Sequence, residues 1–235
     1  MDTKKSLKKI INLISMAVTA ILISCSCGKD NIVRYETWIN FLYPVSITPN
    51  TDTINVGDTL WIEVNLPDSI YDNTNSRKFY LPSFNFQSYM SVRKLVDNTA
   101  NWSFQLNSSN NFNTKNNIGS IYKTTSSSID FQPVYQNNHY VFKGAIIPKD
   151  NGVYCLVFTN FSYEQRLTEI LGLEQIKPLA PDANNFSIKL DFIDYKINNG
   201  NTHYNIFTQH CKSNNDAPSN LYWKEENYIY TFVVK

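Results

Sequence analysis

Apolar and polar residues alternate along most of the chain beyond residue 43, with a period of two residues. The clearest case runs from Leu60 to Leu66, where aliphatic residues alternate with Trp61, Glu63 and Asn65. Alternation of this kind predicts a strand with one buried face. Many short strands separated by turn residues indicate a mainly β protein, built as an antiparallel sandwich. The further predicted strands, divided by breaks rich in Asn, Ser and Asp such as 107–117 and 124–128, lie at 77–86, 89–95, 102–106, 118–122, 129–135, 140–147, 153–160, 186–197 and 228–234.

The N-terminus has a different pattern. Four lysines within residues 1–9 precede an apolar run at 10–23, which is typical of a secretory signal peptide. The run is shorter than the roughly 20 residues that a transmembrane helix requires. The sequence Leu22-Ile23-Ser24-Cys25 resembles the bacterial lipobox, which implies cleavage before Cys25 and diacylation of its thiol. Two or three acyl chains would give a lasting membrane anchor. An uncleaved N-terminal anchor is the alternative.

These features divide the chain into three parts. We expect a lipoprotein signal peptide at 1–24, a lipidated N-terminus and tether at 25–40, and a folded body at 41–235. Residues 26–31 resemble the export signal of Bacteroidota surface lipoproteins, and an ordinary polar tether fits them equally well. The resemblance implies a lipoprotein anchored in the bacterial outer membrane and displayed at the cell surface.

Charge and composition narrow the range of partners. The formal net charge is +1, but the leader carries four lysines and one aspartate, so the exported part has a charge of about −2. A chain without a basic field is a poor partner for nucleic acid. Aromatic residues make up 14% of the chain, which is too many for a disordered protein.

One segment points to a particular kind of sandwich. The sequence from Asp150 through Gly152 to Tyr154 resembles the Asp-x-Gly-x-Tyr corner of immunoglobulin-type domains. The resemblance implies an immunoglobulin-like sandwich in which the Tyr154 hydroxyl bonds back to the preceding loop. It also makes 153–160 and 228–234 the last two strands of the fold.

The stretch between these two strands is too long for a loop. About 65 residues separate them, where two to five are usual for a hairpin. We therefore expect an insertion with its own structure at about 163–226. Its pattern predicts helices at 164–173 and 203–211, and a strand at 186–197.

The strand at 153–160 is apolar on both faces and so requires cover on both sides. The opposite sheet would cover the face that carries Tyr154, and the insertion would cover the face that carries Cys155. Cys211 lies in the insertion, which would cover Cys155. Disulfides form in the oxidising environment that an exported chain meets, so we expect a disulfide between Cys155 and Cys211. Two unpaired thiols are the alternative.

The sequence contains none of the motifs that usually mark catalysis. It has no nucleophile elbow, phosphate-binding loop or dinucleotide-binding fingerprint. His203 and His210 precede Cys211 without a zinc-site spacing, so we expect surface histidines and no metal. Carboxylate pairs such as Asp191 and Asp194 are more typical of a solvated surface than of a glycosidase cleft. We therefore expect no enzyme activity and no cofactor.

Aromatic residues outside the predicted core are the best candidates for ligand binding. Tyr222 and Trp223 lie in the predicted loop before the last strand, and Trp61 lies on the polar side of its strand. Packing of Trp61 beneath the insertion is the alternative. Ser69, in Asp68-Ser69-Ile70, resembles the O-glycosylation site of Bacteroidota proteins, although such tripeptides also arise by chance.

The sequence thus favours a non-catalytic binding module, held at the membrane by its acyl chains, with a glycan or protein as ligand. A structural or assembly accessory of the envelope is one alternative, in which the insertion docks on an envelope protein. A β-sandwich hydrolase is the other, and it would require a cleft with two carboxylates.

Overall fold

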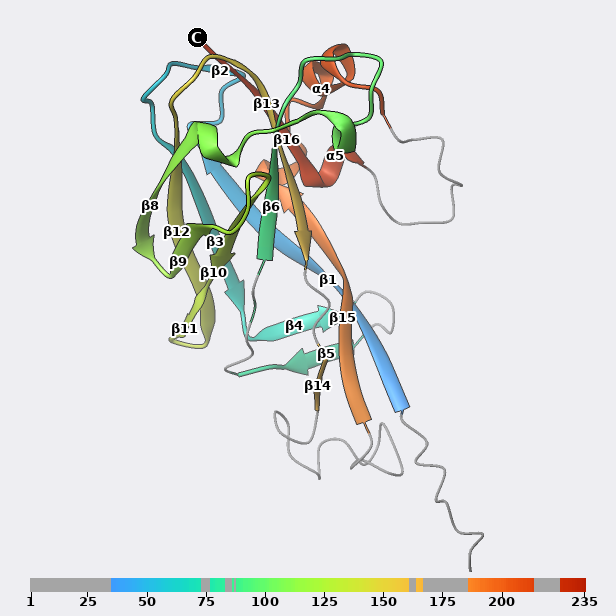
Figure 1. Cartoon of the computed structure of the whole chain (residues 1–235). Coiled ribbons are helices and arrows are strands. Elements are labelled where there is room, and N and C mark those ends of the chain that lie inside the picture. The colour runs from blue at the N-terminus through green and yellow to red at the C-terminus, as the bar shows by residue number, and fades with distance from the viewer. Residues whose placement is uncertain are drawn as a thin grey trace, which may run out of the picture. The chain divides into compact units, whose positions relative to one another are not determined.

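Two β-sheets packed face to face form the body of the protein (Figure 1). The structure is a computed structural model, and it describes residues 35–72, 77–82, 86, 88–160, 164–166, 186–213 and 225–235. All of these residues belong to one compact unit, Tyr35–Lys235. None of the helices in the described ranges has the length and apolar composition needed to cross a bilayer.

The first sheet has the strand order β11-β12-β3-β1-β15-β14, with β8 also paired to β12. These strands are β11 (Val134–Gln136), β12 (His139–Pro148), β3 (Leu60–Pro67), β1 (Tyr35–Thr48), β15 (Phe186–Ile197), β14 (Glu164–Arg166) and β8 (Phe112–Ile118).

The second sheet has the order β2-β16-β13-β6-β10-β9, with β7 also paired to β6. These strands are β2 (Thr53–Ile54), β16 (Ile229–Val234), β13 (Gly152–Asn160), β6 (Ser88–Lys94), β10 (Ser128–Gln132), β9 (Ser120–Lys123) and β7 (Leu106–Asn107).

The remaining described elements are short. Strands β4 (Ser69–Asp72) and β5 (Arg77–Tyr80) form a separate hairpin, and α4 (Tyr204–His210) and α5 (Glu225–Tyr228) are α-helices. Single 3₁₀ turns occupy Trp102–Phe104, Ser109–Asn111 and Asn198–Gly200. The mainly β sandwich with few, short helices is therefore confirmed.

The sheets are mixed, which corrects the expectation of a purely antiparallel sandwich. Strand β15 runs parallel to β1 from Tyr35 to Val45, and β2 runs parallel to the end of β16. Parallel neighbours require a long connection between them. For β1 and β15, that connection includes most of the chain. The segment expected as an insertion therefore contributes a strand to the first sheet.

A single apolar cluster fills the space between the two sheets. In β3 the predicted alternation is confirmed, because its aliphatic residues are buried while Trp61 and Glu63 remain partly exposed. The cluster is rich in aromatic rings, each of which stabilises the fold by roughly 1.5–3 kcal/mol when fully buried. Its largest buried side chains include Tyr43, Phe86, Phe112, Phe131, Tyr140, Phe142, Tyr154, Phe158, Tyr230 and Phe232.

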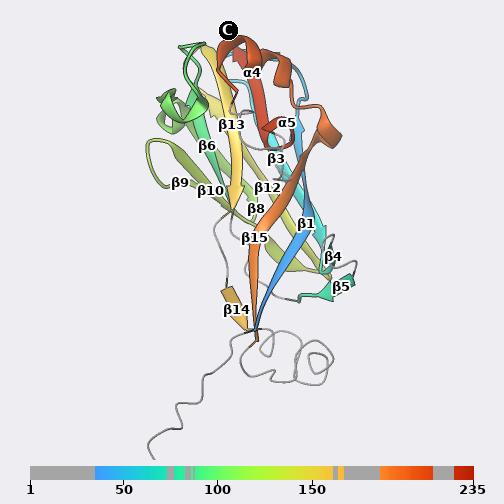
Figure 2. The same ribbon diagram turned by 90° about the vertical axis from the view of Figure 1, so that its right-hand side faces the viewer.

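Strand β13 is buried on both faces, as the sequence predicted. Tyr154, Leu156 and Phe158 belong to the central cluster. Cys155 and Val157 face the other way and belong to a second cluster with Leu95, Phe207, Cys211 and Ile229. Because Phe207 is on α4, the segment after β15 covers the outer face of the second sheet, where Figure 2 shows α4 and α5 beside β13.

The corner at Asp150 carries the chain from one sheet to the other. Strand β12 lies in the first sheet and β13 in the second. The Tyr154 hydroxyl donates to the carbonyls of Asp150 and Asn151 at 3.3 and 3.4 Å, and it accepts a bond from Asn111 Nδ2 at 3.2 Å. Gly152 has a φ of +143°, a conformation that L side chains rarely adopt.

Several elements differ from those that the sequence predicted. Residues 102–104 form a 3₁₀ turn and only Leu106 of the predicted strand at 102–106 is in a strand, β7, while the Asn-rich break at 107–117 contains β8. Strand β8 is polar because it lies at the sheet edge, where its backbone pairs with β12 and its side chains meet solvent. Residues 164–166 are strand β14 rather than helix, and the rest of that predicted helix lies outside the described residues. Strand β1 begins at Tyr35, inside the range assigned to the tether.

Candidate binding surfaces

A loop at Val96–Leu106, here called the Phe104 loop, holds the most exposed aromatic ring in the described chain. Phe104 is 79% exposed, Val96 58% and Leu106 54%. Large apolar side chains are usually buried, so three exposed together on one short loop form an apolar surface that a partner could cover.

A buried side chain holds this loop in one conformation. Gln105 is 4% exposed, and its Oε1 accepts bonds from the backbone N–H groups of Val96 and Asp97 at 2.8 and 3.1 Å. Its Nε2 donates to the carbonyls of Asp97 and Ala100. A single amide therefore satisfies four backbone groups of the loop and fixes their relative positions.

The same loop is joined to the segment that follows α4. The Lys212 N–H donates to the Ala100 carbonyl at 3.0 Å, and the Cys211 thiol donates to the same oxygen at 3.2 Å. Trp102 packs against the second cluster, and the Arg93 guanidinium lies 5.8 Å from the centre of its ring. The loop is thus anchored through Trp102 on one side while Phe104 is exposed on the other.

Trp61, a candidate ligand contact from sequence, lies on the outer face of the first sheet. Its ring is partly exposed, and the ammonium groups of Lys115 and Lys143 lie 5.5 and 5.3 Å from its centre. Lys143 also pairs with Glu63 at 2.7 Å. Helix α4, which belongs to the expected insertion, covers the second sheet, whereas Trp61 lies on the first sheet. Trp61 therefore does not pack beneath α4. Instead, a lysine from β8 and a lysine from β12 lie beside its ring.

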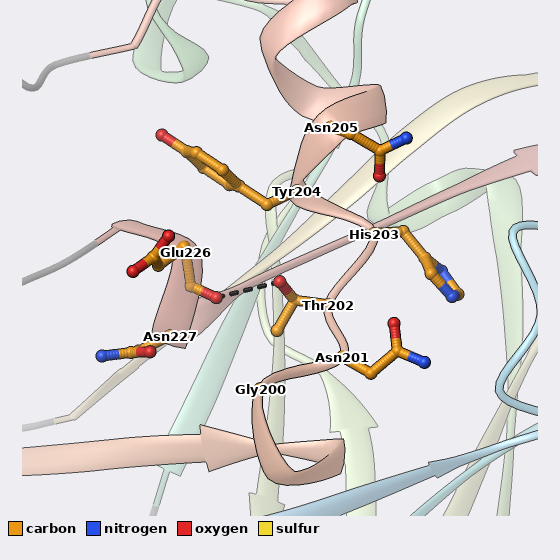
Figure 3. Close-up of a pocket in the computed structure, with 8 residues that line it drawn as sticks. All are labelled: Gly200, Asn201, Thr202, His203, Tyr204, Asn205, Glu226 and Asn227. Atoms are coloured by element: carbon orange, nitrogen blue, oxygen red, sulfur yellow. Dashed lines mark hydrogen bonds between the residues drawn. The ribbon is translucent and has the colours of Figure 1, made fainter.

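A polar pocket of about 410 Å³ lies between α4 and α5 (Figure 3). In Figure 3, His203 points away from Glu226, and the Thr202 hydroxyl donates to the Glu226 carbonyl at 2.9 Å. The titratable side chains of the pocket therefore do not converge on a common point. The pocket is lined by Gly200, Asn201, Thr202, His203, Tyr204, Asn205, Glu226 and Asn227.

A buried carboxylate lies beside this pocket. Glu225 is 3% exposed, and it accepts hydrogen bonds from the hydroxyls of Tyr204 at 2.9 Å and Ser213 at 2.6 Å. Burial, with Glu225 and Tyr204 adding to it, raises the pKa of Tyr228 to about 12. These bonds hold α5 against the start of α4, which is a structural role.

The structure corrects the expected disulfide. Cys155 and Cys211 lie in the same buried cluster, but both are free thiols. The Cys211 thiol is directed instead at the Ala100 carbonyl, and it also receives a bond from Gln105 Nε2 at 3.8 Å. Burial raises the pKa of Cys211 to about 11 and that of Cys155 still further, so both thiols are protonated at neutral pH.

Other candidates from sequence have mixed outcomes. Cys25, Tyr222 and Trp223 lie outside the described residues. Ser69 is exposed at the start of β4. The described ranges contain no group of three or more side chains able to hold a metal ion.

Sequence reasoning missed Phe104. The residues Trp102, Phe104 and Leu106 alternate as in a strand, and alternation does not tell which side faces solvent. A buried Gln between two apolar residues leaves no pattern in the sequence that would identify a fixed, exposed loop.

Comparisons with known proteins add little. No protein-family model and no curated protein matches the chain. A similar solved structure is the second type II cohesin module from the adaptor scaffoldin ScaA of Acetivibrio cellulolyticus, with 8% sequence identity and a TM-score of 0.26. The match covers 51% of this chain and 72% of that chain. Similarity at this level supports no argument about function, and the fold assignment rests on the described sheets.

Proposed function

We propose that the protein is a lipid-anchored, non-catalytic binding module of the bacterial envelope, and that the Phe104 loop is its contact surface for a protein partner. The observation that carries the proposal is the 79% exposure of Phe104 on a loop fixed by buried Gln105. Aromatic side chains that enter a partner's pocket supply much of the binding free energy at protein interfaces. A loop already fixed in shape loses little conformational entropy when it binds.

A protein partner fits this loop better than a lipid surface. Asp97 is the only charged residue between Val96 and Leu106, so the loop offers no basic side chain to anionic headgroups. Strand β1 begins at Tyr35, and the start of β1 lies at the end of the sandwich opposite the Phe104 loop (Figures 1 and 2).

The Phe104 loop is joined to the segment after α4, which belongs to the expected insertion. This link favours an assembly role, in which the insertion docks on an envelope protein. Cys211 and Lys212 both bond to Ala100, so a partner that binds Phe104 would also meet the end of α4. The hydrolase alternative has less support, because His203 and Glu226 diverge in the described pocket (Figure 3).

The anchor is tested by fractionation of cells that express the full chain. Cys25→Ala should move the protein from the membrane to the soluble fraction, whereas the control Cys27→Ala should leave it in the membrane. Continued membrane association of the Cys25→Ala protein would contradict lipid anchoring.

The binding surface is tested by a photoreactive phenylalanine analogue placed at position 104, with position 122 as the control. Tyr122 is also exposed, at 40%, but it lies on β9. We expect one discrete protein adduct at 104 and none at 122, and we expect Leu106→Asp to abolish it. The partner, once identified and purified, should bind Phe104→Ala at least tenfold more weakly than the unchanged protein. Equal adducts at both positions, or a dimer of this chain, would overturn the proposal.

A further inference from the structure

The hairpin of β4 and β5 carries a second exposed aromatic surface, unrelated to the Phe104 loop. Tyr71 and Tyr80 are each 49% exposed. The pairing sets Ser69 opposite Tyr80 and Tyr71 opposite Lys78, which places all four residues on one face. Ile70 and Asp72 point to the other face and are buried. The two rings are diagonal neighbours on a flat face that is open to solvent.

A third tyrosine, Tyr135, lies beside Tyr80 and is held by a buried carboxylate. The Tyr135 hydroxyl donates to Asp68 Oδ2 at 2.7 Å. This bond raises the pKa of Tyr135, and burial, the charge of Asp68 and the neighbouring Tyr80 add to the effect. Asp68 is 5% exposed, so the carboxylate that binds the Tyr135 hydroxyl is itself held in the core.

The charge on this face is positive. Lys78 is exposed and lies directly across from Tyr71. Within the described ranges, no carboxylate forms an ion pair with Lys78. The two acidic residues of the hairpin region, Asp68 and Asp72, are both buried.

We propose that the face formed by Ser69, Tyr71, Lys78 and Tyr80 binds a carboxylate-bearing sugar, with the pyranose ring stacked on the tyrosines and the carboxylate paired with Lys78. Flat aromatic rings provide an apolar surface with a polar edge, which suits the mixed surface of a sugar. The ammonium group of Lys78 complements a uronate carboxylate. The face has no aliphatic side chain, so it offers no pocket for an apolar peptide anchor.

The proposal is tested by affinity electrophoresis and calorimetry on the purified full chain in detergent. The probes are polygalacturonate, alginate and fully methyl-esterified polygalacturonate, in which the carboxylates are neutral. We expect binding to at least one acidic polymer, weaker binding at higher salt, and at least tenfold weaker binding to the ester.

Matched variants separate the contribution of the rings from that of the charge. Tyr71→Ala and Tyr80→Ala should each lower the affinity at least tenfold, whereas Tyr122→Ala should not change it. Lys78→Met should lower the affinity for the acid to that for the ester, whereas Lys149→Met should leave the preference intact. Far-ultraviolet circular dichroism must show each variant folded, and Tyr71→Phe should retain binding.

Three outcomes would overturn the proposal: no binding to either acidic polymer, equal affinity for acid and ester, or equal losses in the control variants. The adduct at position 104 serves as an independent readout. If it persists while sugar binding fails, only the sugar site is refuted, and the proposed protein contact stands.

Discussion

The bonding of Gln105 gives a sharp test of how the Phe104 loop is held. Gln105→Ala removes an amide that forms four hydrogen bonds to the loop backbone, two through Oε1 and two through Nε2. A hydrogen bond of this type contributes about 0.5–1.5 kcal/mol, and a buried group left without a partner adds to the loss. Water can replace some of these bonds once the loop opens, so we expect each bond to contribute in the lower half of that range. The four bonds together then lower the free energy of unfolding by about 3 kcal/mol when they are removed.

The assay is urea unfolding followed by tryptophan fluorescence, since Trp102 lies in the loop itself. Gln136→Ala is the control, because Gln136 is exposed on β11 and its replacement should change the free energy of unfolding by less than about 0.5 kcal/mol. Cys211 is 2% exposed and contacts Gln105, so its modification by a thiol reagent in native buffer should also become faster. A loss below about 1 kcal/mol with unchanged thiol reactivity would refute the reasoning.

Three further predictions follow from the packing and the backbone. Phe207→Ala should lower the free energy of unfolding by about 3–5 kcal/mol, because its ring is fully buried in the second cluster, whereas exposed Gln209→Ala should have little effect in the same urea titration. Gly119→Ala should lower the melting temperature far more than Gly57→Ala: both have positive φ, but only at Gly119 would a Cβ meet a backbone oxygen, at 2.4 Å. Burial raises the pKa of Cys211 from 9.0 to about 11. The contribution of the Cys211 thiol to stability is therefore complete below about pH 9 and is lost as the pH rises towards 11. Urea unfolding of the unchanged protein and of Cys211→Ser over this pH range should show a weaker pH dependence of the free energy of unfolding in the variant.

Much of the local structure could be predicted from the sequence, because burial of one face imposes a period of two. Strand β15 and helix α4 occur where their patterns predicted, and β3 buries the expected residues. The apolar character of both faces of β13 correctly predicted that a second element covers it. These predictions depend only on which residues avoid water.

Other elements depend on pairing partners, which no local pattern records. Strand β8 is polar along most of its length and forms because β12 offers a free edge. The parallel pairing of β1 with β15 joins segments that lie far apart in the chain. The pattern gave no reason to favour these neighbours over others.

The candidate surfaces divide in the same way. The sequence alone shows the period-two pattern of the strands, the corner motif at Tyr154 and the lack of recognised catalytic motifs, and it predicts a signal peptide that ends before Cys25, since each is a local pattern of residue types. Only the tertiary structure decided that Phe104 is exposed while Trp102 is packed, and that Tyr71, Lys78 and Tyr80 share one open face. Exposure is decided by what packs above a side chain, and that neighbour comes from a distant part of the chain.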